Sequence, residues 1–336
     1  MQGRGHLRRM IRIPALFAAC AAALLLTATT ASAAPTGTIV SGTTWTDNNG
    51  SPVNAHGGGM IKVGGTYYWI GEFKDSTGAF VANACYSSTD LQHWTFVNRT
   101  LVKQASGDLG PDRIVERPKI MYNKTTNQYV QTMHVDNLTY KDEAVGVATS
   151  STVCGNYTYQ GRLKLNGSTI KKWDSGSFQD SDGTGYVITH NGNIYKLAAD
   201  YLSAVSQPLS AMCSNCESPA LFKVGGTYYF LFSHRTSWAT NDNFYFTATS
   251  LAGPWTSRGN LAPSGTHTWD SQTTYVLPVV GSSTTTYMFM GDRWNASDLG
   301  SSTYVWQPLV VSGTALSMPA FHASWTIDTG TGKATF

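Results

Sequence analysis

One six-residue sequence, Lys-Val-Gly-Gly-Thr-Tyr, occurs twice in this chain of 336 residues, at residues 62–67 and 223–228. In both copies the Gly-Gly pair lies between short stretches rich in apolar and aromatic residues. Such a pair supplies the positive φ angles of a tight turn, so each copy predicts a β-hairpin. A hairpin used twice, with different polar residues at its ends, indicates a repeated scaffold that carries a site.

Further hairpin patterns recur along the chain. Their first strands are expected to begin near Met60, Lys119, Gly176, Ala220 and Tyr275, at intervals of 44 to 59 residues. Helical periodicity is nearly absent, and five units of about four strands at a long period are typical of a β-propeller. We therefore expect an all-β, five-bladed β-propeller in a single domain. A two-sheet sandwich is the alternative, but it would not need this long-period repetition.

The first 33 residues have the pattern of a secretory signal peptide. Four arginines precede an apolar run at residues 13–26, and Ala31-Ser32-Ala33 is a small-residue cleavage site. The apolar run is too short for a transmembrane helix. We expect a secreted, extracellular protein whose mature domain spans residues 34–336. Without the four arginines the net charge is near −1, so neither nucleic acid nor a membrane is an expected partner.

Four of the five cysteines follow the signal segment: Cys85, Cys154, Cys213 and Cys216. An even number of cysteines in an exported protein suggests disulfide bonds. Cys213 and Cys216 form a lone Cys-x-x-Cys with no second copy, which disfavours a zinc site or a redox motif. We expect a structural disulfide between them, with Cys85 and Cys154 either paired or free.

Carboxylates precede three of the five expected inner strands: Glu116, Asp174 and Glu217. In a propeller the first strand of each blade lines the central axis, so residues at the starts of these strands should converge at one mouth of the channel. Acids are rarely buried at such positions without partners or a function. Ten Trp and seventeen Tyr residues suit stacking against sugar rings, and Trp238, Trp294 and Trp306 are candidates for sugar subsites, each equally compatible with a place in the core.

Clustered carboxylates in an aromatic cleft are the groups used to cleave glycosidic bonds. One protonated acid gives its proton to the leaving oxygen, and in the inverting mechanism water attacks from the opposite face, with carboxyl groups ~6.5–9.5 Å apart. Apolar surroundings raise the pKa of the acid so that it is protonated when needed.

The chain resembles glycoside hydrolase family 43, and in particular its exo-β-1,3-galactanase branch, subfamily 24. The motifs that carry the resemblance are Ala55-His-Gly-Gly-Gly59, Glu116-Arg-Pro-Lys119, Asp174-x3-Phe178-x-Asp180-x-Asp182-Gly183, Glu217-Ser-Pro-Ala220 and Ser271-Gln-Thr-Thr274, in the family's order. The resemblance implies a five-bladed propeller and inversion at the anomeric carbon.

The resemblance also implies the roles of individual residues. Glu217 matches the general acid, Asp174 the residue that modulates its pKa, and Glu116 a residue that holds sugar hydroxyls and supports the transition state. The expected substrate-binding residues are Glu72, Tyr140, His56 and Asp136. For His56, a hydrogen-bonded structural role is more plausible than that of a base. Asp180 and Asp182 are expected to form a turn, and no metal or cofactor is expected.

One family feature is missing from this sequence. Most of family 43 has a catalytic-base aspartate on the first blade, where this chain has His56-Gly57. The galactanase branch lacks the same aspartate and is thought to use a glutamine on the fifth blade to position or activate water. Gln272 occupies that place here. Because an amide is a very weak base, Glu116 acting as the base is the alternative.

The resemblance therefore predicts a secreted, monomeric, inverting exo-β-1,3-galactanase. It would hydrolyse the β-1,3-galactan backbone of type II arabinogalactan from the non-reducing end and release galactose. The alternatives are an α-L-arabinofuranosidase or β-xylosidase of the wider family, and a non-catalytic carbohydrate-binding propeller. The missing aspartate disfavours the first alternative, and the retained carboxylates disfavour the second.

Overall fold

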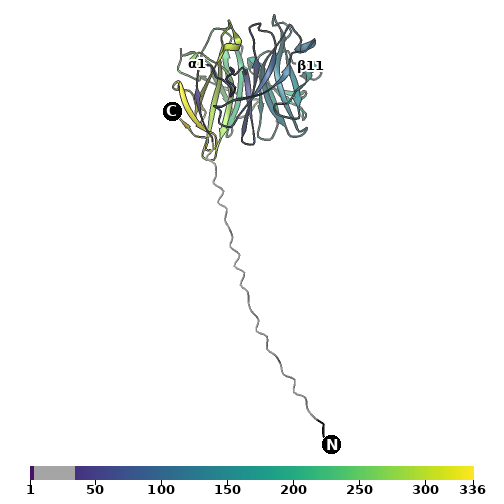
Figure 1. Ribbon diagram of the computed structural model, residues 1–336. Coiled ribbons are helices and arrows are strands. Elements are labelled where there is room, and N and C mark those ends of the chain that lie inside the picture. Colours follow the sequence, from purple (N-terminus) through teal and green to yellow (C-terminus); the bar gives the residue numbers. More distant parts are fainter. Residues whose placement is uncertain (4–34) are drawn as a thin grey trace. The chain divides into compact units, whose positions relative to one another are not determined.

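The computed structural model describes residues 1–3 and 35–336, and the regular structure of residues 35–336 consists almost entirely of short β-strands (Figure 1). The predicted signal peptide falls almost wholly outside the described residues. No helix of the described part is long and apolar enough to cross a membrane. The prediction of an all-β propeller is confirmed.

Four sheets are simple meanders of four strands, each strand pairing with the next. They are β2(His56–Val63), β3(Thr66–Phe73), β4(Ala82–Ser88) and β5(Thr95–Val102); β6(Arg113–Asn123), β7(Gln128–Asn137), β8(Ala144–Ser150) and β9(Thr158–Arg162); β16(Cys216–Val224), β17(Thr227–His234), β18(Phe244–Ala248) and β19(Thr256–Asn260); and β20(Gln272–Val280), β21(Thr285–Arg293), β22(Thr303–Ser312) and β23(Ala315–Ser317). The two Lys-Val-Gly-Gly-Thr-Tyr copies form the turns β2–β3 and β16–β17, as the sequence predicts.

The sheet between β9 and β16 has six strands, because a short extra hairpin joins the usual four. Its meander is β12(Ser175–Gln179), β13(Gly185–Thr189), β14(Asn193–Leu197) and β15(Ala204–Leu209), and β10(Lys164–Leu165) and β11(Ser168–Thr169) extend it at the β15 edge. The first strands of these five sheets contact one another in the order β2, β6, β12, β16, β20 and back to β2. They therefore form a closed ring around one axis.

A sixth sheet pairs two distant parts of the chain. β1(Thr36–Val40) lies antiparallel to β24(Ser324–Asp328), which also pairs with β25(Ala334–Thr335). Counted by sheets, six blades are present, so the predicted count of five is wrong. The hairpin repeat could not reveal this sheet, because its central pairing joins residues almost 290 positions apart and follows no local turn.

The sixth sheet packs on the largest aromatic cluster of the protein. Trp325 and Ile327 of β24 are buried against Trp69 and Trp306, which belong to the first and last four-stranded sheets. The sequence left Trp306 as a residue of either a sugar subsite or the core. It is only 1% exposed and therefore belongs to the core. This cluster fixes the first and last four-stranded sheets to each other.

Four short helical segments complete the described part: η1(Gly107–Leu109), η2(His190–Gly192), α1(His267–Asp270) and η3(Leu299–Ser301). The four cysteines of the described part form two disulfides. The predicted Cys213–Cys216 bond is confirmed, and Cys85 of β4 pairs with Cys154, which follows β8.

Candidate active site

A cavity of about 380 Å³ lies where the inner strands converge. Its walls are mainly charged and aromatic, and they come from all five meander sheets or the loops beside them. The lining includes Glu72, Lys74, Glu116, Arg117, His134, Tyr140, Trp173, Asp174, Glu217, Trp238, Gln272, Asp292 and Trp294. The three carboxylates that the sequence places before inner strands, Glu116, Asp174 and Glu217, therefore share one cavity.

The inner strands bend at this cavity by the same device. In β6 and β16 the register with the partner strand shifts directly after Glu116 and Glu217, as in a β-bulge. The next residue, Arg117 or Ser218, has a φ near +55° (55° and 56°), and a proline without an N–H follows it. The bulge leaves the rest of the hairpin regular and turns the side chains at the mouth toward the axis.

The first inner strand makes the same bend with a glycine. Gly57 has a φ of 57°, and a Cβ on it would lie 2.2 Å from Oε1 of Glu72. Its N–H donates to Oδ2 of Asp292 at 3.1 Å. The carboxylates of Glu72 in β3 and Asp292 in β21 thus fill the space beside Gly57. This leaves no room for an acidic side chain at this position of β2.

Glu217 has the environment of a proton donor. Burial, together with the negative charge of Asp174, raises the pKa of its carboxyl to about 7, although Arg117 and Arg235 act in the opposite direction. Nε2 of Gln272 donates to Oε1 of Glu217 at 3.0 Å. The carboxyl is therefore protonated in a substantial fraction of molecules near neutral pH.

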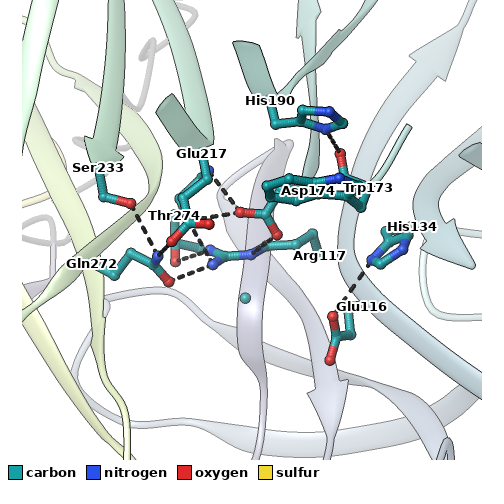
Figure 2. Close-up of polar contacts among 12 residues, drawn as sticks. Glu116, Arg117, His134, Trp173, Asp174, His190, Glu217, Ser233, Gln272 and Thr274 are labelled. Atoms are coloured by element: carbon teal, nitrogen blue, oxygen red, sulfur yellow. Dashed lines mark hydrogen bonds and ion pairs between the residues drawn. The ribbon is translucent and has the colours of Figure 1, made fainter. Parts of the chain in front are cut away.

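Asp174 is ionised although it is buried. Burial opposes its ionisation, but the positive charges of Arg117 and His134 outweigh burial and hold the pKa of Asp174 below its usual value. Nε of Arg117 donates to Oδ1 of Asp174 at 3.2 Å, and Ser218 donates to Oδ2 through its N–H and its hydroxyl. Figure 2 shows the contact between Arg117 and Asp174. The neighbouring carboxyls of Asp174 and Glu217 are thereby kept in different protonation states.

Glu116 and Glu72 share one buried cation, Lys74. The Nζ atom of Lys74 lies 2.8 Å from Oε2 of Glu72 and 3.1 Å from Oε1 of Glu116. Burial raises the pKa of Glu72, whereas for Glu116 the charges of Lys74 and His134 outweigh burial and hold the pKa well below its usual value. Tyr140 also donates its hydroxyl to Oε1 of Glu116 at 3.1 Å. An acid held this strongly in its ionised form is a weak base.

His134 completes the cationic side of the cavity. Its Nε2 lies 3.1 Å from Oδ2 of Asp136, and its Nδ1 lies 3.5 Å from Oε2 of Glu116. Burial alone would lower the pKa of His134. The contacts with these two carboxylates outweigh burial and raise the pKa to about 9. His134 therefore carries a positive charge near neutral pH.

The amide of Gln272 uses its full hydrogen-bonding capacity. Its Oε1 accepts from Arg117 Nη2 at 2.5 Å and from Trp294 Nε1 at 2.9 Å. Its Nε2 donates to Glu217 and to Ser233 Oγ, both at 3.0 Å. Because Arg and Trp side chains can only donate, the atom facing them must be the oxygen, and the orientation of the amide is fixed by its partners.

Two residues predicted to bind substrate do not line the cavity. Asp136 lies behind His134, and His56 stacks on Tyr304, and both side chains are fully buried. Neither side chain reaches the cavity wall, because β7 and β2 direct both into the protein. The structural reading of His56 agrees with its place, 3.5 Å from a carboxylate oxygen of Asp292.

Other sequence predictions are now placed. Glu72, Tyr140, Trp238 and Trp294 line the cavity, and Trp238 is 50% exposed at its rim. Asp180 and Asp182 lie at the β12–β13 turn as expected, although Asp180 also pairs with Lys223. Within residues 35–336 no cluster of three or more His, Cys, Asp or Glu side chains could hold a metal ion.

Four residues of the cavity wall were not predicted as site residues from the sequence: Lys74, Arg117, His134 and Asp292. Two of them are cross-strand partners of predicted residues: His134 pairs with Glu116, and Asp292 pairs with Gln272. Counting back from each hairpin turn, and allowing for the bulge, would have found them.

The chain is similar to a family of sugar-cleaving enzymes. The family model described as Glycosyl hydrolases family 43 matches residues 52–235. No curated protein sequence matches the chain.

Several solved structures share the fold over most of the chain. An exo-β-1,3-galactanase from Phanerochaete chrysosporium, solved with β-1,3-galactotriose, is 38% identical with a TM-score of 0.83, and the match covers 89% of this chain and 70% of that one. An exo-β-1,3-galactanase from Clostridium thermocellum is 35% identical with a TM-score of 0.82, and the match covers 89% and 68%. A putative exo-β-1,3-galactanase from Bifidobacterium bifidum is 34% identical with a TM-score of 0.78, and the match covers 84% and 96%.

Proposed function

The chain belongs to glycosyl hydrolase family 43, and from this premise we propose that it is an exo-β-1,3-galactanase. It hydrolyses β-1,3-galactan, the backbone of type II arabinogalactan, from the non-reducing end and releases galactose with inversion of the anomeric carbon. Relatives named as exo-β-1,3-galactanases at 35% and 38% identity support this substrate. One fungal relative was solved with galactose and with β-1,3-galactotriose.

The observation that carries the proposal is the pairing of Glu217 and Asp174 in one small cavity. A pKa of about 7 leaves Glu217 able to hold a proton at neutral pH, and Asp174 beside it stays ionised. Glu217 gives its proton to the glycosidic oxygen while the bond from that oxygen to the anomeric carbon breaks. The charge of Asp174 raises the proton affinity of Glu217, and Ser218 links the two residues.

Glu116 and Gln272 act on the sugar and on the attacking water. Glu116 is an ionised carboxylate. It accepts hydrogen bonds from hydroxyl groups of the terminal sugar and stabilises positive charge at the anomeric carbon in the transition state. This role suits its low proton affinity better than the alternative role of base. Water bonds to the anomeric carbon on the face opposite the leaving oxygen and gives up its proton to solvent. Gln272 positions this water with an N–H that turns to it from Glu217 or Ser233. Glu72 and Tyr140 make further contacts to the sugar from the cavity wall.

The cavity, at about 380 Å³, lies near the lower end of the range for ligand pockets, which begin at about 300 Å³. This supports removal of one terminal sugar at a time. We further propose that residues 1–33 are a signal peptide, that residues 34–336 are the catalytic domain, and that the enzyme is secreted and works as a monomer. The arginine-rich start and the small-residue site at Ala31-Ser32-Ala33 support export.

Incubation of the purified protein with β-1,3-galactan, and in parallel with aryl α-L-arabinofuranoside and aryl β-xyloside, tests the function. We expect galactose as the product and its loss in Glu217→Gln. Release of arabinose or xylose without galactose would contradict the galactanase assignment. Galactan binding without turnover in the parent protein would instead indicate a carbohydrate-binding propeller.

A further inference from the structure

Arg117 lies buried in the wall of the cavity and uses all five of its N–H groups. Its Nε donates to Asp174, and its Nη1 donates to the carbonyl of Thr273 and the hydroxyl of Thr274. Its Nη2 donates to Ser218 Oγ at 2.7 Å and to Gln272 Oε1 at 2.5 Å (Figure 2). A guanidinium with five satisfied donors in a planar fork is held in one position.

The bulge in β6 directs Arg117 to this position. Glu116 and Arg117 are neighbours in sequence, yet the left-handed backbone of Arg117 separates their side chains. Glu116 meets Lys74 and His134, while Arg117 reaches residues next to or within β12, β16 and β20. One guanidinium therefore joins the neighbours of Glu217 on two sides: the carboxylate of Asp174 and the amide of Gln272.

The contact between Arg117 and Gln272 decides which atoms of the amide face Glu217. With Arg117 and Trp294 both donating to Oε1, the oxygen can carry no proton, and Nε2 is left to face Glu217 and Ser233. Without these donors the amide could rotate by 180° and present its oxygen to Glu217. A carboxylic acid facing an oxygen would donate its own proton there and be turned away from a substrate.

We propose that Arg117 is a positioning residue for the hydrolysis, which fixes the amide of Gln272 and the carboxylate of Asp174 on either side of Glu217. The proposal rests on the proposed function of this site and adds a residue to it. Arg117 acts on the reaction through Glu217 and Gln272. Its second effect is electrostatic, since its charge faces Glu217 together with that of Arg235 and against that of Asp174.

A purely structural role of Arg117 as a link between strands leads to a different expectation. Loss of a structural link lowers the stability of the protein but leaves the titration of Glu217 unchanged. Loss of a positioning cation also changes that titration, because the charge of Arg117 lowers the pKa of Glu217. The two roles therefore differ in a readout that does not depend on turnover.

Two variants distinguish the charge of Arg117 from its planar set of donors. Arg117→Met removes both, whereas Arg117→Lys keeps the charge and loses the planar guanidinium. We expect both to lower kcat on β-1,3-galactobiose by about 10- to 1,000-fold with KM within about 3-fold, the range of a lost catalytic orientation. In Arg117→Met the alkaline limb of the kcat/KM profile should move to higher pH. In Arg117→Lys, which keeps the charge, it should stay within about 0.3 pH unit of the parent. Unchanged kcat in both variants would overturn the proposal.

Carbon-13 NMR of the Glu217 carboxyl, assigned with Glu217→Gln, gives the same titration without substrate. A higher midpoint in Arg117→Met supports the proposal, and an unchanged midpoint overturns it. If the parent releases no galactose but the NMR midpoint still shifts, the galactanase assignment has failed and the link between Arg117 and Glu217 stands.

Two further variants guard against misfolding. Arg162→Met is the matched control, because Arg162 pairs with Asp108 and Asp142 away from the cavity; we expect lower stability and an unchanged pH profile. If neither Arg117 variant folds, Trp294→Phe tests the proposal instead. It removes the hydrogen bond that Trp294 donates to Gln272 Oε1 and leaves the charges of the site unchanged. We expect it to lower kcat by about 3- to 30-fold without shifting the alkaline limb. Full activity in Trp294→Phe would then overturn the proposal.

Discussion

Ser218 donates both its backbone N–H and its hydroxyl to Oδ2 of Asp174, at 2.7 and 2.9 Å. Because Ser218 directly follows Glu217, these two bonds hold the bulge of β16 against the carboxylate at the start of β12. The position of the proposed proton donor is thus determined by the residue whose charge also raises its pKa. Asp174 therefore determines both the position of Glu217 and its proton affinity.

Replacing Asp174 by Asn should shift the pH optimum of the enzyme downward. The variant removes the negative charge that raises the pKa of Glu217, so the acid loses its proton at lower pH. We expect the alkaline limb of kcat/KM to move down by about one pH unit, with a lower maximal rate. The control is Asp182→Asn at the exposed β12–β13 turn, which should keep the parent profile. An unshifted limb in Asp174→Asn would mean that Asp174 does not modulate Glu217.

Replacing Glu217 by Gln should affect substrates according to their leaving groups. A sugar leaving group needs a proton from Glu217, whereas dinitrophenolate leaves without one. We expect kcat/KM on β-1,3-galactobiose to fall by about 1,000-fold and that on dinitrophenyl β-galactoside by less than about 10-fold. Equal losses on the two substrates would exclude Glu217 as the acid.

His134 should make the protein less stable as the pH rises from 6.5 to 9. Its pKa is about 9 in the folded protein and near 6.5 in the unfolded chain, so its stabilising contribution is complete below pH 6.5 and is lost as the pH approaches 9. Relative to His134→Asn, the parent should lose about 3 kcal/mol of unfolding free energy across this window. Urea unfolding of both proteins at several pH values measures it. Buried Lys119, whose pKa is lowered to about 7, acts in the opposite direction and cancels in the difference between the proteins.

The two disulfides should differ in their contributions to stability. Cys85 and Cys154 are separated by 69 positions, whereas Cys213 and Cys216 are separated by 3. Loop-closure entropy gives about 4 kcal/mol for the long loop and about 2 kcal/mol for the short one. Thermal unfolding of the Cys85→Ser/Cys154→Ser and Cys213→Ser/Cys216→Ser double variants should show the larger loss in the first. The reverse order would indicate that native contacts, and not chain entropy, dominate.

The sequence was most informative where structure is local. The Gly-Gly turns at residues 64–65 and 225–226 predicted both hairpins, and the spacing of the hairpins predicted the propeller. Glu116, Asp174 and Glu217 could be placed at one mouth because inner strands of a propeller converge there. A turn and an alternating strand are determined by neighbouring residues, so a linear pattern contains this information.

Features determined by pairing between strands were not predicted. His134 and Asp292 become site residues through the register of β7 and β21, which depends on the bulges in the partner strands. Arg117 reaches its partners Asp174 and Gln272 because of its positive φ, which nothing in the residue type suggests. For the same reason the sequence could not show that Asp136, two residues from His134, lies behind that residue and not on the cavity wall.

The pairing of β1 with β24 also has a consequence for biosynthesis. A nascent chain must extend past Asp328 before residues 36–40 can find their partner strand. The hairpins can form one after another as they leave the ribosome, since each depends on neighbouring residues. The seam between the first and last meanders, however, closes only after residues 324–328 have been synthesised. Until then the aromatic cluster around Trp69 and Trp306 is incomplete, so unfinished chains expose an apolar surface that chaperones would recognise.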